Sequence, residues 1–204
     1  MKGKIRIVVS LIVFFTALSL FPDRVFTQET CLVVLDVQEF SKKSKELDNS
    51  VNEMIRNVNS LISLFNAGNV IYIKSATLAL NISFKGISVD TLPVPGFDSS
   101  LKIVSNNIFI KTEGDAFTVE QFDDFLKSEN TKRIVLVGLM AEKCIYHTAT
   151  GGKDRGYDIV VVSEGIVGMT EKKKDKAIRK MQDKGIEFIS LDEITVRGID
   201  GIKQ

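Results

Sequence analysis

The sequence predicts a three-layer α/β/α fold built on a mostly parallel, six-stranded sheet. Short apolar segments rich in β-branched residues recur along the chain, and segments with helical spacing separate them. The apolar runs are continuous, as in strands that are buried on both faces. Strands that alternate with helices form right-handed βαβ units, which place helices on both faces of one sheet. The length of 204 residues fits a single domain of this kind.

Each predicted element has a local reason. The strand segments are apolar runs that end at a charged, glycine or turn residue, and they cover 31–35, 70–74, 108–110, 134–137, 158–162 and 186–189. The helical segments carry apolar residues on one face, and they cover 47–66, a stretch that begins at Thr118, 141–153 and 170–184. The segment 75–107 has no strong periodicity, and loops of this length in a compact domain usually have a function. We therefore predict that it is irregular and forms part of the wall of a substrate site.

The amino-terminal residues differ in composition from the rest of the chain. A basic start with two lysines and one arginine precedes an apolar run over residues 7–21, which is the pattern of a secretory signal. A helix of this length spans about 22 Å, less than the roughly 30 Å core of a bilayer. We predict that residues 1–27 are a signal peptide and that 28–204 form an exported domain, periplasmic or secreted. An uncleaved anchor through residues 7–21 is the alternative, and only then is a membrane contact expected.

Composition limits the chemistry that this domain can carry out. The formal net charge of +1 gives no reason to expect a nucleic acid partner. The single histidine excludes metal sites built on paired histidines. Two cysteines do not make a disulfide framework. A bridge between Cys31 and Cys144 is not expected, because Cys31 begins a predicted strand and Cys144 lies beyond the opposite end of another.

Three chemically competent residues follow the carboxyl ends of predicted strands. They are Asp36, Lys111 and Cys144, and open α/β sheets bind their ligands at this edge. A thiol close to a helix amino terminus is favoured as the thiolate, which makes Cys144 a candidate nucleophile. Each residue alone also has a structural interpretation, as a buried cysteine or as an aspartate that caps a helix or turn. The three together favour catalysis.

Three motifs resemble the isochorismatase-like (cysteine hydrolase) superfamily, which includes nicotinamidases and N-carbamoylsarcosine amidohydrolases. They are VVLDVQ at 33–38, KTEGDAF at 111–117, and GLMAEKCIYHTATGGKDRGYDIVVV at 138–162. The resemblance covers residues 31–189. It implies that Asp36, Lys111 and Cys144 form a catalytic triad with Cys144 as the nucleophile.

The resemblance also implies the surroundings of this triad. Phe40 and Phe117 are expected in the substrate pocket, and a cis peptide bond is expected between Leu139 and Met140. The backbone N–H groups of Met140 and Cys144 are expected to form an oxyanion hole. Nicotinamidases hold a metal with an aspartate and two histidines after the second strand, but residues 74–95 contain no histidine. We therefore expect neither a metal nor another cofactor.

The function implied is hydrolysis of a small amide-type C–N bond through a thioester intermediate. Two alternatives remain open: a catalytically silent member that binds a small molecule or a partner, and a hydrolase of an isochorismate-like enol ether. His147 lies three residues after Cys144 and can share a helix face with it, and we favour a packing or supporting role for it. A homo-oligomer is a further expectation, because oligomers are common in the superfamily.

Overall fold

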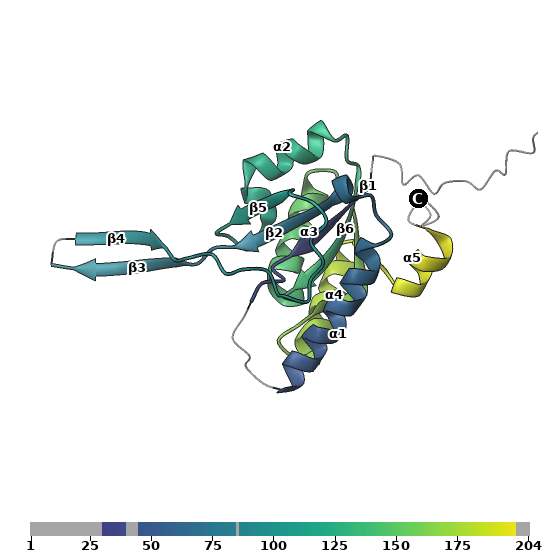
Figure 1. Cartoon of the computed structure of the whole chain (residues 1–204), viewed down its shortest axis with the longest axis horizontal. Helices are drawn as coiled ribbons and strands as arrows, with labels where there is room; N and C mark the ends of the chain where they lie inside the picture. Colours follow the sequence, from purple (N-terminus) through teal and green to yellow (C-terminus); the bar gives the residue numbers. More distant parts are fainter. Residues whose placement is uncertain (1–29, 40–44, 85, 199–204) are drawn as a thin grey trace, which may run out of the picture.

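We describe the protein from a computed structural model that defines residues 30–39, 45–84 and 86–198 (Figure 1). The predicted signal segment and Phe40 lie outside these ranges. Within them, no helix has the length and apolar character needed to cross a membrane.

The body of the molecule is one six-stranded sheet in which all neighbouring strands are parallel. Its strands are β1 (Thr30–Leu35), β2 (Val70–Ser75), β5 (Ile108–Lys111), β6 (Arg133–Leu139), β7 (Asp158–Val167) and β8 (Glu187–Ile189). Their order is β5-β2-β1-β6-β7-β8. The six predicted strands are all present, and the predicted fold class is confirmed. Since β1 lies between β2 and β6, the ends of these strands meet at one edge.

Helices cover both faces of this sheet (Figure 1). The buried apolar side chains form two core clusters, one on each face of the sheet. The first core cluster lies between the sheet and the helices α1 (Lys45–Ile62) and α5 (Leu191–Arg197). The second core cluster lies between the sheet and the helices α2 (Glu120–Ser128), α3 (Tyr146–Asp154) and α4 (Glu171–Asp183). Two 3-10 turns, η1 (Ala67–Asn69) and η2 (Ala116–Thr118), and a π-helical turn, η3 (Ala141–Ile145), connect these elements. The sequence did not predict α5, because this short helix buries a single apolar residue, Ile194.

The prediction that residues 75–107 are irregular is wrong in one part. Strands β3 (Leu78–Ser83) and β4 (Gly86–Thr91) form an antiparallel hairpin that is separate from the main sheet. Figure 1 shows this hairpin projecting away from the body beyond the end of β2. Its strands alternate apolar and polar residues with a period of two, which indicates strands with one apolar face. Each run is only six residues long, and prolines follow the second.

Candidate active site

The three candidate residues lie in direct contact. The Nζ atom of Lys111 is 2.9 Å from Oδ2 of Asp36 and 3.2 Å from Sγ of Cys144. Lys111 ends β5, Asp36 follows β1, and Cys144 follows β6, so the parallel sheet brings them to one edge. The Lys111 side chain is fully buried, the Asp36 side chain is 11% exposed, and Cys144 is half-buried. A buried ammonium between a carboxylate and a thiol is an arrangement that can activate sulfur.

Ser75 is a fourth member of this cluster that sequence reasoning missed. Its hydroxyl donates to Oδ1 of Asp36 at 2.8 Å and accepts from Nζ of Lys111 at 2.7 Å. The Lys111 ammonium also donates to the carbonyl of Glu113 at 3.2 Å. A single serine in a sequence does not by itself indicate a functional site, but Ser75 directly follows a predicted strand, as Asp36 and Lys111 do. That position was the signal available to find it.

The side-chain amide of Gln38 holds Ser75 and Pro95 by hydrogen bonds. Its side-chain oxygen accepts from the backbone N–H of Ser75 at 2.7 Å. Its Nε2 donates to the carbonyls of Ser75 and Pro95, both at 3.2 Å. Gln38 also pairs through its backbone with Phe97. Part of the segment 75–107 therefore lies beside the cluster, and its role as a wall of the substrate site stays a prediction.

The backbone at Asp36 turns the carboxylate into the site. Asp36 has a φ of +58°, in the left-handed region that aspartate and asparagine tolerate better than most residues. Its backbone N–H still donates to the carbonyl of Ile73 at 2.9 Å. The end of β1 is thus held to β2 while the Asp36 side chain points at Lys111 and Ser75.

Cys144 sits in the π-helical turn η3, immediately before α3. The carbonyl of Met140 accepts from the backbone N–H groups of Lys143 at 2.9 Å and Ile145 at 3.3 Å, the latter spanning five residues. Such wide turns are frequent at functional sites. The peptide bond between Leu139 and Met140 is cis, at the position expected from the resemblance. The turn thus begins one residue after the cis bond and carries Cys144 as its fourth residue.

The surroundings of Cys144 raise the pKa of its thiol. Burial is the largest cause, the negative charge and hydrogen bonding of Asp36 add to it, and Lys111 offsets part of the rise. The helix amino terminus alone predicted the opposite direction, because the sequence gives no measure of burial. The resting sulfur is therefore a protonated thiol with a carboxylate beside it that can accept its proton.

Gly138 permits the close approach of β6 to β1 on which this geometry depends. It has a φ of +123°, and a Cβ atom there would overlap the backbone carbonyl of Leu35. We expect Gly138→Ala to lower the free energy of unfolding by about 2–4 kcal/mol, through backbone strain and steric overlap together. Urea denaturation measures this change. Gly68→Ala is the control, because no atom lies within 4 Å of its added Cβ; equal stability of the two variants would contradict the prediction.

Of the other predicted site residues, the structure describes His147 and Phe117 but not Phe40. The ring of His147 lies against Gly114, in the loop that follows Lys111, while Lys111 is the residue that contacts Sγ of Cys144. Phe117 is buried in the second core cluster, with its ring 5.4 Å from that of Tyr157. A contribution of Phe117 to the substrate pocket stays a prediction, as do the oxyanion donors.

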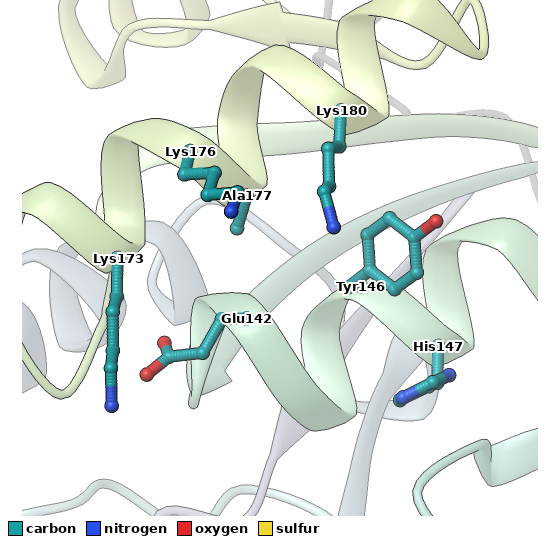
Figure 2. A pocket seen from close by; sticks show the side chains of 7 residues that line it. All are labelled: Glu142, Tyr146, His147, Lys173, Lys176, Ala177 and Lys180. Atoms are coloured by element: carbon teal, nitrogen blue, oxygen red, sulfur yellow. The ribbon is translucent and has the colours of Figure 1, made fainter.

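A basic cleft of about 360 Å³ is lined by side chains of η3, α3 and α4. Figure 2 shows Lys173, Lys176 and Lys180 reaching from α4 toward the segment that carries Glu142, Tyr146 and His147. The Glu142 carboxylate accepts from the backbone N–H of Met169. Asp36, Lys111 and Cys144 do not line the cleft, so we assign it no part in the reaction.

The donor set near the cluster does not fit a metal site of the nicotinamidase kind. Residues 74–95 contain no histidine. Among the residues that the structure describes, no three histidine, cysteine, aspartate or glutamate side chains converge.

Fold and site together define a three-layer α/β protein with its candidate site at the carboxyl edge of a parallel sheet. The chain belongs to the isochorismatase family of hydrolases, because the sequence model of the isochorismatase domain matches residues 30–193. A curated relative, the secreted isochorismatase effector Isc1 of Verticillium dahliae, is 26% identical over 156 residues, which are 75% of this chain and 80% of the relative.

Solved structures show the same fold. A nicotinamidase/pyrazinamidase of Acinetobacter baumanii superposes with a TM-score of 0.64 at 18% identity, over 82% of this chain and 98% of that one. An isochorismatase family protein of Desulfovibrio vulgaris gives a TM-score of 0.66 at 18% identity, over 82% and 96%. At this level of identity the likeness is one of fold.

Proposed function

We propose that the protein is a cysteine hydrolase that cleaves a small amide-type C–N bond through a thioester, with Asp36, Lys111 and Cys144 as its triad. The observation that supports it best is the contact of one buried ammonium with both the carboxylate and the thiol. A purely structural lysine needs only the carboxylate. An amine placed on sulfur as well stabilises the thiolate that forms when the proton leaves.

The acylation step follows from these contacts. Asp36 takes the proton of the Cys144 thiol, and the sulfur attacks the carbonyl carbon of the substrate. The Lys111 ammonium stabilises the thiolate as it forms. The backbone N–H groups of Met140 and Cys144 receive the oxyanion, and one such donor typically contributes about 3 kcal/mol. Asp36 then gives its proton to the leaving amine, which leaves the acyl group on sulfur.

Deacylation reverses the roles of the same groups. Asp36 accepts a proton from water as the water attacks the thioester, and the acid product leaves. The proton returns to sulfur, so the resting thiol is restored. Amide and water become acid and amine, with no oxidant, metal or organic cofactor in the balance.

A substrate panel tests this proposal. Primary amides, carbamoyl compounds and hydrazides are incubated with the protein, and release of ammonia or hydrazine is measured. Mass spectrometry of quenched samples should show the acyl adduct on the Cys144 peptide with at least one of these substrates. The covalent route would be excluded if the parent chain turned over substrate without an acyl adduct and the Cys144→Ala variant kept the same turnover.

We also propose that the protein is exported. The basic and apolar pattern of residues 1–27 supports this, as does the printed description of the Verticillium dahliae relative as secreted. Amino-terminal sequencing of the protein recovered outside the cytoplasm distinguishes a cleaved signal from an anchor that is retained through residues 7–21.

A further inference from the structure

The β3–β4 hairpin is amphipathic and carries an exposed apolar face. Residues paired directly across an antiparallel hairpin point to the same side. Leu80 pairs with Val89, and Leu78 pairs with Thr91. Their side chains are exposed: Leu78 by 48%, Leu80 by 61% and Val89 by 59%. With Ile87, which is 71% exposed, these residues form what we call the arm face.

The opposite face of the hairpin has a different character. Ser88 and Asp90 lie there, together with Ala79, the register partner of Asp90. A hairpin whose two faces both met water would not need this segregation. An isolated two-stranded hairpin is at best marginally stable in water, and one that leaves its apolar side chains exposed gains nothing from burying them. The segregation therefore indicates that the arm face packs against another surface.

A second apolar surface is exposed on the same chain, at the β5 edge of the main sheet. Ile108 and Ile110 lie on β5 and are 39% and 51% exposed, and Ile103 and Val104 are 43% and 42% exposed. Val104 is tied to this edge of the sheet, because it donates its backbone N–H to the hydroxyl of Tyr72, the residue that pairs with Ile108 across β2 and β5. We call these four residues the edge patch.

In the part of the chain that the structure describes, the edge patch is left exposed. Its β5 residues lie on the face of the sheet that α1 covers, but α1 packs over β6 and β7, farther along the sheet. The hairpin of the same chain continues outward from the end of β2 and projects away from the main sheet (Figure 1). Within one molecule, therefore, the two exposed apolar surfaces do not meet.

We propose that the hairpin is a dimerisation arm whose arm face packs on the edge patch of a second copy of this chain. Two apolar surfaces that do not contact each other within one chain can both be buried in a two-fold symmetric dimer of that chain. Each copy then supplies one arm and one patch, so the contact is made twice. A strand pair of this length is about 17–20 Å long, and two such contacts approach the roughly 800 Å² per partner of a stable interface.

Sedimentation velocity of the full chain tests the proposal. At about 10 μM, ten times a typical micromolar dissociation constant, we expect a dimer. The double variant Leu80→Asp/Val89→Asp is expected to be a monomer, and so is Val104→Asp/Ile108→Asp. Ser88→Asp is the control, because it places an added negative charge on the polar face of the same hairpin, and it should remain a dimer. All substituted side chains are exposed in the single chain, so the circular dichroism of every variant should match that of the parent chain.

Crosslinking identifies the two surfaces that meet. In a Cys144→Ala background, chains that carry Leu80→Cys are mixed with chains that carry Ile108→Cys and treated with a short bis-maleimide. Cys31 is buried and stays unreactive. The mixture should give covalent dimers, and either chain alone should give few. A monomeric parent chain would overturn the proposal, as would dimers from Leu80→Cys alone, or a monomer that binds lipid vesicles through Leu80 and Val89.

Discussion

Cys144→Ala is expected to lower kcat by about 10⁴-fold or more while the fold is retained. The proposed reaction has no other nucleophile, and residual rates after loss of a covalent nucleophile come from binding and oxyanion contacts alone. The side chain is half-buried, and its contact with Lys111 is the hydrogen bond that disappears. Stability should therefore change by only about 1 kcal/mol.

The measurement is steady-state turnover of the best substrate of the panel, with circular dichroism and urea denaturation of the same samples. Cys31→Ala is the control, because Cys31 is buried at the amino end of β1, away from the site edge. It should keep near-parent turnover even if it lowers stability. Activity of Cys144→Ala within about tenfold of the parent chain would be incompatible with a covalent nucleophile.

Asp36→Asn should change turnover and thiol reactivity in opposite directions. Turnover is expected to fall by about 10³-fold or more, since the amide cannot take the thiol proton or pass it to the leaving amine. The thiol, however, should become more reactive toward iodoacetamide at neutral pH. Asp36 raises the pKa of the Cys144 thiol by its charge and hydrogen bond, and Lys111, which lowers it, remains in place.

The sign of this effect follows from the charges. A raised pKa means that the thiolate appears only at higher pH; removal of the carboxylate charge lowers the pKa, so the thiolate appears at lower pH. The labelling-rate profile of Asp36→Asn should therefore shift to lower pH than that of the parent chain. Cys144 is the thiol being measured, since complete burial raises the pKa of Cys31 to about 12.

Asparagine is the appropriate substitution for this measurement. It tolerates the positive φ of residue 36 and keeps an oxygen for the Ser75 hydroxyl. Cys144→Ala gives the labelling background, which should be close to zero. If the profile of Asp36→Asn shifted to higher pH, Asp36 would not be the group that holds the proton on sulfur.

The fold could be predicted from the sequence because its strong signals are local. Strands β1 and β6 contain continuous buried apolar runs, and α1 is amphipathic at helical spacing. The hairpin could not be predicted in the same way. Each of its strands is only six residues long and alternates apolar with polar residues, and the apolar residues are exposed rather than part of a core.

The site could be predicted in part for a related reason. Asp36, Lys111 and Cys144 are reactive residue types at strand ends, and the topology of a parallel sheet brings strand ends together. Ser75 and Gln38 act through hydrogen bonds that exist only after β1 and β2 are paired. The direction of the Cys144 pKa depends on burial, which a sequence does not contain.

The proton on Cys144 has a further consequence under the proposed reaction and the proposed export. Peroxides and disulfides react with thiolates far faster than with thiols, and the first product of that reaction is a sulfenic acid or a mixed disulfide. Because its surroundings raise the pKa of the Cys144 thiol, the resting sulfur carries less thiolate and reacts more slowly with such oxidants. In the proposed mechanism, Asp36 would therefore protect the same sulfur atom that it activates, and an unpaired cysteine would be expected to persist in an oxidising environment.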